Sequence, residues 1–302
     1  MKYILTKHII GPRDIIFISQ EEYEICKKAR ECLLECLHIE EKINVVIENY
    51  REFEMMLLDY TMRSAIYNEV SWSLLNEERN NINRRLANLL TACRLYLDHL
   101  IHHLNIIFGQ DSEHVAIIRK IISCEYDSEI SYRIMEALRN FIQHNGFPIT
   151  SLTHNHGWNE DRTFIINNIQ PFVSIPYLEL DKDFKRSVLE EMKAIGDTID
   201  IRMYVRSYVA SLGKIQDRVR DIIHTYSGAW EDRIDSTIQK YPDFADKKSE
   251  PVSLVIAIMR DDETYYDVVY LFREYIQRWK QLERKHARTQ YLPKQHVTTA
   301  AK

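Results

Sequence analysis

Three polar side chains near a predicted helix end are the best candidates in the sequence for catalysing a reaction. Arg139, Asn140 and His144 lie in the stretch EALRNFIQHNGFP, residues 136–148. An arginine can bind a phosphate through two parallel hydrogen bonds, and a histidine can transfer a proton near neutral pH. At about 100° per residue, Asn140 and His144 share one face of a helix, and the long side chain of Arg139 can reach it. These groups suffice to open RNA through its own 2′-hydroxyl, with no metal ion.

The stretch that carries these residues has the pattern of the end of an amphipathic helix. Its apolar residues recur at helical spacing: Ile134, Met135, Leu138, Phe141 and Ile142. Asn145-Gly146 followed by Pro148 predicts the helix C-terminus, because glycine adopts the left-handed cap conformation and proline has no N–H for the helix. His144 is then in the last turn, where the negative end of the helix dipole stabilises an imidazolium. The alternative is that Arg139 is a surface charge and His144 only caps the helix.

The motif and its position resemble the signature of HEPN domains. In that signature an arginine, often followed by a polar residue, precedes a histidine by four to six positions near a helix end, as Arg139, Asn140 and His144 do here. The resemblance covers residues 73–148, including the long helical segment upstream. It implies a metal-independent endoribonuclease in which two protomers pair so that two motifs line one cleft. Other members have lost catalysis and bind RNA or a partner protein.

The predicted site follows from the motif and from this resemblance. His144 would deprotonate the 2′-hydroxyl or protonate the leaving 5′-oxygen, Arg139 would stabilise the phosphorane, and Asn140 would orient one of them. Substrate-binding roles are predicted for Gln143 beside them, and for Asn81 and Arg85. The last two lie at the start of the 73–108 helix, which would face the motif if the chain folded back antiparallel. The alternative for them is a solvated helix surface.

A second constellation suggests metal chemistry instead. His99 and His103 are four residues apart and could face one ion from one helix, with His102 and Asp98 nearby. No glutamate lies between them as in a zinc protease helix, so partly exposed histidines between the core leucines of the helix are the simpler interpretation, and we predict neither metal nor cofactor. The loop histidines His154 and His156 are explained by exposure. Glycine-rich phosphate loops, zinc-type cysteine spacing and nucleophile elbows are not visible in the sequence, which removes support for most nucleotide-using enzymes and common hydrolases.

Composition points to a helical protein of the cell interior. Only seven Gly and seven Pro occur in 302 residues, and the formal charge of −5 argues against a broadly basic surface that coats nucleic acid. Five cysteines, an odd number without zinc spacing, indicate reduced thiols and a cytoplasmic location. The start lacks the apolar region of a signal peptide, and no stretch is long enough to cross a membrane.

Hydrophobic periodicity predicts the order of the elements. Helices are expected over residues 20–50, 52–70, 73–108, 113–123, 128–144, 184–195, 199–222, 226–240 and 264–288. Strands are expected over 3–5, 15–18, 163–169, 172–180 and 252–259, with the fourth extending the small sheet that the first two begin, a polar connection over 151–162, and a disordered last dozen residues. Arginines 202, 206, 218 and 220 alternate with aspartates, which favours a salt-bridged face over an RNA-binding stripe.

Together these observations predict a mainly α protein: a HEPN-like antiparallel helical bundle with a small β-sheet embellishment and a second helical half. The expected divisions are 1–72, strands and helices packing on the bundle; 73–148, the HEPN-like core; and 149–302, an α/β-embellished half of unknown role. The expected partners are tRNA or mRNA, a second copy of the chain, and an antitoxin or regulatory protein. A toxin or anti-phage defence role follows from family analogy only.

Overall fold

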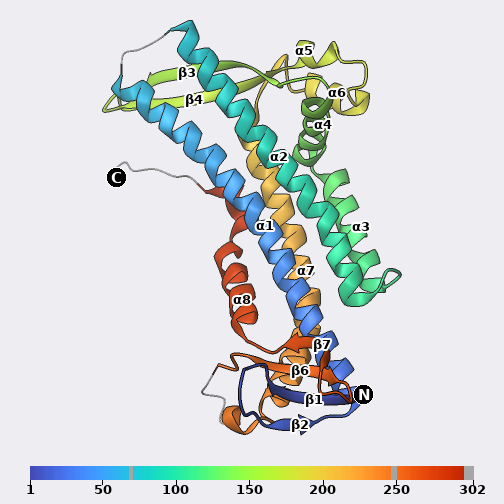
Figure 1. Ribbon diagram of the computed structural model, residues 1–302. Coiled ribbons are helices and arrows are strands. Elements are labelled where there is room, and N and C mark those ends of the chain that lie inside the picture. The colour runs from blue at the N-terminus through green and yellow to red at the C-terminus, as the bar shows by residue number, and fades with distance from the viewer. Residues whose placement is uncertain (68–70, 246–249, 296–302) are drawn as a thin grey trace. The chain divides into compact units, whose positions relative to one another are not determined.

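The computed structural model describes residues 1–67, 71–245 and 250–295, and it is mainly helical (Figure 1). The α-helices of these residues are α1 Gln20–Ile66, α2 Trp72–Phe108, α3 Glu113–Ser128, α4 Ile130–His144, α5 Ile175–Glu179, α6 Arg186–Lys193, α7 Ile201–Ile238 and α8 Glu274–His286. The strands are β1 Lys2–Lys7, β2 Ile15–Phe17, β3 Ile149–Trp158, β4 Ile165–Ser174, β5 Thr198–Asp200, β6 Leu254–Met259 and β7 Tyr265–Tyr270. Two short 3-10 helices, η1 Pro242–Phe244 and η2 Thr289–Lys294, complete the set.

The chain divides into two compact units, each assembled from three separated segments. Unit 1 comprises Met1–Glu41, Leu100–Ala116 and Arg218–Lys285, and unit 2 comprises Lys42–His99, Ile117–Asp217 and His286–Lys302. Helices α1, α2 and α7 each contribute residues to both units. Each unit combines residues from all three divisions expected from the sequence, 1–72, 73–148 and 149–302.

Unit 1 contains a four-stranded antiparallel sheet with the strand order β2-β1-β6-β7 (Figure 1). β1 pairs along its whole length with β6, from Lys2 opposite Met259 to Lys7 opposite Leu254. The strands expected over 3–5, 15–18 and 252–259 are confirmed. The sheet does not continue through 172–180, as was expected, because β6 and β7 supply the remaining strands. The apolar β6 lies between β1 and β7, where a strand buried on both faces is favoured.

The helix expected over 264–288 begins later than periodicity predicts. Residues 265–270, with the sequence YYDVVY, form β7, and α8 begins only at Glu274. Tyrosine and valine favour a pleated, half-buried surface, and β6 offers a free edge for pairing. The first part of this prediction was wrong because a strand partner outweighed the helical spacing of the apolar residues.

Two long helices are continuous where a break was expected. Residues 20–50 and 52–66 form the single helix α1, and the end of the second predicted helix, residues 68–70, lies outside the described residues. Residues 201–238 likewise form one helix, α7, through the expected break near residue 224. Neither junction contains a proline, and Gly228 inside α7 is tolerated at a cost of about 1 kcal/mol relative to alanine.

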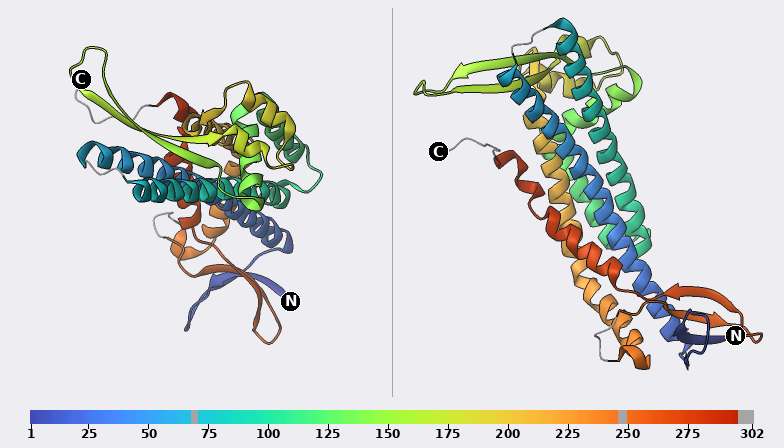
Figure 2. Two further views of the ribbon diagram at one scale, coloured as in Figure 1. Left: turned by 90° about the horizontal axis from the view of Figure 1, so that it is seen from above. Right: turned by 60° about the vertical axis from the view of Figure 1, so that its left-hand side comes forward.

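Unit 2 contains a second antiparallel sheet with the strand order β3-β4-β5. Figure 2 shows the long hairpin that β3 and β4 form. The expected polar connection over 151–162 is wrong, since β3 runs to Trp158 and pairs with β4 from Ile149 opposite Val173 to Trp158 opposite Ile165. The two strands expected over 163–169 and 172–180 are instead one strand, β4, followed by the short helix α5. A polar strand in a hairpin buries one face at most, so its composition resembles that of a loop.

The sequence also led to expectations about the cysteines, the arginines of the 199–222 helix, membrane spans and the last dozen residues. All five cysteines are free, and four of them are buried. The four arginines of the suspected basic stripe all form ion pairs. Arg202 and Arg218 pair with the interleaved aspartates Asp200 and Asp221, as expected. The expected solvent-exposed face is wrong for the other two arginines, which pair with Glu54 and Glu40 of α1. Within the described residues, no helix is long and apolar enough to span a membrane. Of the last dozen residues, 291–294 belong to η2, and 296–302 lie outside the described residues.

Unit 1 also holds a cluster of charged side chains from α1, α7 and α8. Both oxygens of Glu40 accept hydrogen bonds from Arg220, from Nε and Nη2, each at 2.8 Å. Glu283 forms a hydrogen bond with the His224 ring at 2.9 Å, and 14% of its side chain is exposed. Burial raises the pKa of the Glu283 carboxyl; His224 and Arg220 lower it, and Glu40 raises it further.

The raised pKa of Glu283 predicts a pH dependence of stability. A raised carboxyl pKa means that the folded state prefers the protonated acid, so its contribution to stability is lost as pH rises through the folded-state pKa. Glu283→Gln keeps an oxygen for His224 and cannot ionise. The free energy of unfolding of the variant minus that of the wild type should therefore increase from about pH 4 to about pH 8. Urea unfolding across this range measures it; a difference that falls with pH would contradict the prediction.

Candidate active site

Helix α4 carries the motif and is strongly amphipathic. Its buried side chains are Ser131, Tyr132, Ile134, Met135, Ala137, Leu138 and Phe141. The predicted apolar stripe is therefore buried, except that Ile142 is half-buried. The helix starts two residues later than expected, at Ile130, because α3 continues through Asp127 and Ser128. It ends at His144, which confirms that this histidine occupies the last turn.

The end of α4 differs from the expected glycine cap. The N–H groups of Asn145 and Gly146 both donate to the Phe141 carbonyl, at 2.8 and 3.2 Å. Asn145 has a φ of −124°, and Gly146 is not among the residues with positive φ. No left-handed residue is needed here, because the chain leads directly into β3, which begins at Ile149. The predicted cap conformation was wrong, although the predicted helix end was right.

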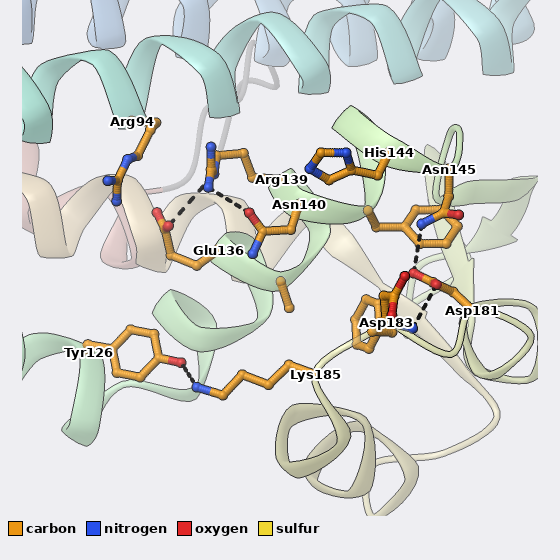
Figure 3. A pocket seen from close by; sticks show the side chains of 13 residues that line it. Arg94, Tyr126, Glu136, Arg139, Asn140, His144, Asn145, Asp181, Asp183 and Lys185 are labelled. Carbon is orange, nitrogen blue, oxygen red and sulfur yellow. Dashed lines mark hydrogen bonds and ion pairs between the residues drawn. The ribbon is translucent and has the colours of Figure 1, made fainter.

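The polar side chains at this end of α4 line a pocket of about 540 Å³ in unit 2 (Figure 3). Its basic side chains are Arg94 from α2, Arg139 and His144 from α4, and Lys185, which precedes α6. Its carboxylates are Glu136, Asp181 and Asp183. Asn140 and Asn145 also line it, so all three predicted catalytic residues share one cavity.

Arg139 is held in place by neighbours on its own helix. Its Nη2 donates to Asn140 Oδ1 at 2.6 Å, and its Nη1 donates to Gln143 Oε1 at 3.1 Å. Its Nε lies 3.8 Å from Glu136 Oε2. Only 18% of its side chain is exposed. Asn140 and Gln143 therefore orient the guanidinium in this arrangement, and Gln143, predicted to bind substrate, does not line the pocket.

Glu136 is a pocket residue that sequence reasoning missed. Its Oε1 accepts a hydrogen bond of 2.6 Å from the hydroxyl of Tyr208, a fully buried residue of α7. Burial raises the pKa of Tyr208 well above its usual value, so this hydroxyl remains a donor. The sequence indicates Glu136 only through its position three residues before Arg139, which places the two side chains one turn apart on the same helix face.

His144 lines the pocket and is exposed. Figure 3 shows its ring pointing toward the pocket with no bonding partner drawn. Among residues 1–67, 71–245 and 250–295, none forms a hydrogen bond or ion pair with this ring. Both ring nitrogens are therefore available to a bound molecule, which a general acid or base requires.

The opposite wall comes from a segment far away in sequence. Lys185 Nζ donates a hydrogen bond to the Tyr126 hydroxyl and lies 4.8 Å from the centre of that ring. Asp181 accepts a hydrogen bond of 2.8 Å from Asn145 Nδ2. Lys185 lies 41 residues after His144, a distance at which spacing patterns carry no information.

The other predicted substrate-binding residues do not reach this pocket. Arg85 forms an ion pair with Glu52 of α1, and Asn81 Oδ1 accepts from Arg84 at 3.4 Å. Arg94, nine residues further along α2 than Arg85, lines the pocket instead. The antiparallel alignment assumed from the sequence is therefore wrong, since Arg94 and not Arg85 of α2 lines the pocket together with Arg139.

The loop histidines of the sequence analysis lie on β3. His154 Nε2 lies 3.0 Å from Glu78 Oε2, and Glu78 is buried. His156 forms a hydrogen bond with Asn167 of β4. Neither lines the pocket: the His154 contact joins β3 to α2, and the His156 bond joins β3 to β4.

Comparisons with other proteins identify no relative of this chain. No family model matches the sequence, no curated protein matches it, and no solved structure matches the fold. The HEPN resemblance therefore stays a prediction carried by the motif.

Proposed function

We propose that the chain is a metal-independent endoribonuclease that cleaves RNA in the pocket at the end of α4. The observation that supports this proposal is the position of four basic side chains, Arg94, Arg139, His144 and Lys185, around one cavity. A cavity of this size, 540 Å³, has room for a nucleotide with its phosphate.

The proposed reaction needs only groups that line the pocket. The His144 ring takes the proton of the 2′-hydroxyl or gives one to the leaving 5′-oxygen, because its nitrogens are free to do either. Arg139 lies on the same helix end and supplies a fixed positive charge to the phosphorane. Asn140 holds Arg139 at 2.6 Å and thereby orients that charge. Attack by the 2′-oxygen displaces the 5′-oxygen and leaves a 2′,3′-cyclic phosphate.

The carboxylates of the pocket do not prevent anion binding in this proposal. Glu136 accepts from Tyr208, and Asp181 accepts from Asn145 and from the N–H of Asp183. These donors reduce the negative potential that a phosphate would meet. Lys185 and Arg94 add two cations to the lining, of which Arg94 forms an ion pair of 2.8 Å with Asp98 on its own helix.

The proposal includes a second copy of the chain. One histidine cannot act as acid and base in a single step, and two His144 side chains facing one scissile phosphate resolve this difficulty. Such pairing is what the HEPN resemblance implies, and a toxin or defence role restrained by a partner protein follows from the same analogy.

Incubation of the wild-type chain with total tRNA and with mRNA in the presence of EDTA tests this proposal. We expect cleavage that survives the chelator and leaves 2′,3′-cyclic phosphate at one end and 5′-hydroxyl at the other. Products that end in 5′-phosphate would indicate attack by water and contradict the proposal.

A second candidate function is a HEPN-like module that binds RNA or protein without catalysis. It is favoured by the engagement of Arg139, whose guanidinium already contacts Asn140, Gln143 and Glu136. Binding of labelled RNA without cleavage, with equal affinity in wild type and His144→Ala, would select this alternative.

A further inference from the structure

Two helices of unit 1 bring together three side chains that commonly bind metals. Glu35 and His38 lie one turn apart on α1, and His103 lies on α2. One ligand atom from each residue can be chosen so that all three lie within 4.8 Å of one another. Glu35 Oε2 lies 2.5 Å from His103 Nδ1, and Glu35 Oε1 lies 3.4 Å from His38 Nδ1. The carboxylate thus stands between two imidazoles.

These separations are close to those of a tetrahedral metal site. Zinc bonds of about 2.0–2.2 Å to nitrogen and oxygen place neighbouring donor atoms about 3.3 Å apart. The Glu35–His38 distance of 3.4 Å already meets that value. His103 Nδ1 would have to move away from Glu35 by under about 1 Å, within the range of a small side-chain rotation.

The environment suits a metal ion with an open coordination position. The side chains of Glu35 and His103 are 13% and 11% exposed, whereas that of His38 is 43% exposed. The site therefore has two shielded ligands and one at the surface, where an ion can enter and water can complete the coordination.

We propose that Glu35, His38 and His103 form a binding site for one divalent transition-metal ion of the zinc type. Two imidazoles and one carboxylate are a donor set that zinc, cobalt and iron accept, and magnesium does not favour imidazole. This site is formed by other residues than the pocket at the end of α4, so the proposed ribonuclease does not depend on it. Metal binding would join α1 to α2 within unit 1 and stabilise the folded chain.

The sequence analysis considered His103 as a metal ligand, but with another partner. The i, i+4 spacing paired it with His99, whereas the group of potential ligands consists of His103, Glu35 and His38. The link between residues 35 and 103 depends on how α1 packs against α2, which spacing along one helix cannot reveal.

Titration of the full chain, freed of metal by chelation and dialysis, tests this site with cobalt and with zinc. We expect one ion per chain, visible absorption of four- or five-coordinate cobalt that zinc displaces, and a higher melting temperature with zinc. His38→Gln, at the half-exposed ligand, and Glu35→Gln should each weaken zinc binding at least about 10-fold, since even changes outside the ligand shell cost about 10- to 100-fold.

His102→Gln is the matched control. This exposed histidine adjoins His103 and is outside the group of three ligands, so its loss should change zinc affinity less than about 3-fold. If the circular dichroism spectrum of His38→Gln is unchanged, weaker zinc binding by this variant reflects the missing ligand and not a loss of folding. Absence of stoichiometric binding by the wild type, or equal binding by His38→Gln, would overturn the proposal.

Discussion

Replacing His144 with alanine should reduce RNA cleavage by about 10²- to 10⁴-fold, because positioned proton transfer contributes about that much to a reaction rate. His144 is an exposed residue of the pocket, and its ring has no hydrogen-bond or ion-pair partner among the described residues. Its removal should therefore leave folding unchanged, and the loss should appear in the rate of the chemical step. Single-turnover cleavage with saturating enzyme, in EDTA, measures that step directly.

Arg139→Ala should cause a loss of similar size, about 10²- to 10³-fold, because it removes the charge that stabilises the phosphorane. The double variant Arg139→Ala/His144→Ala should be little worse than the worse single variant, since residues that act as one unit are not additive. Arg139 is held by Asn140 and Gln143, so Gln143→Ala should have a smaller effect, exerted through the guanidinium orientation.

The matched control for His144 is His156→Ala. His156 is an exposed histidine in the same unit, but it lies on β3 and does not line the pocket. It should retain wild-type cleavage within about 2-fold. If His144→Ala and His156→Ala cleaved RNA at the wild-type rate, the activity would come from another site or from a contaminant.

Arg220→Met should lower the free energy of unfolding by about 3–5 kcal/mol, the usual cost of leaving one member of a buried ion pair alone. Glu40 is 2% exposed at its side chain and binds both donors of the Arg220 fork at 2.8 Å. Methionine fills a similar volume but leaves that carboxylate buried without its cation. Urea unfolding at neutral pH, followed by circular dichroism, measures the difference.

An exposed pair on the same helix provides the control for this loss. Arg218 and Asp221 lie 3.3 Å apart with 67% and 65% of their side chains exposed. Arg218→Met should cost less than about 1 kcal/mol, because exposed pairs are screened by water. The double variant Glu40→Leu/Arg220→Met should recover most of the loss, since it removes both charges. If Arg218→Met and Arg220→Met lowered the free energy of unfolding equally, burial of the ion pair would not explain its contribution to stability.

Patterns along single segments predicted the helices that depend mainly on residues close together in the sequence. The apolar spacing and the Asn145-Gly146 pair placed the end of α4 at His144, although the glycine does not adopt the expected conformation. The long periodic run of α2 also lies where the sequence predicted it. In both cases the helical spacing of apolar residues is strong over several turns.

Strands and long-range pairings were the parts that the sequence did not reveal. β3 has a polar composition and became a strand only because β4 pairs with it, and β7 depends in the same way on β6. Both pairings come from tertiary structure, so patterns read along one segment misassigned these residues as a loop and a helix.

The sequence predicted the residues at the centre of the candidate site but not the residues that surround them. Arg139, Asn140 and His144 lie on two turns of one helix, so their proximity follows from helix geometry alone. The side chains around them come from other elements: Arg94, Tyr208 and Lys185. Arg94 lines the pocket where Arg85 was expected. The partners of the motif therefore required the fold.

The most direct test of the central claim is a comparison of two RNA oligonucleotides that differ only by a 2′-deoxy sugar at the cleaved position. The wild-type chain, in EDTA, should cut the all-ribose oligonucleotide and leave a 2′,3′-cyclic phosphate, because the 2′-oxygen is the nucleophile. The deoxy oligonucleotide should remain intact at that position while binding equally well. Cleavage of both at the same rate would contradict a reaction through the 2′-hydroxyl and, with it, the proposed roles of Arg139 and His144.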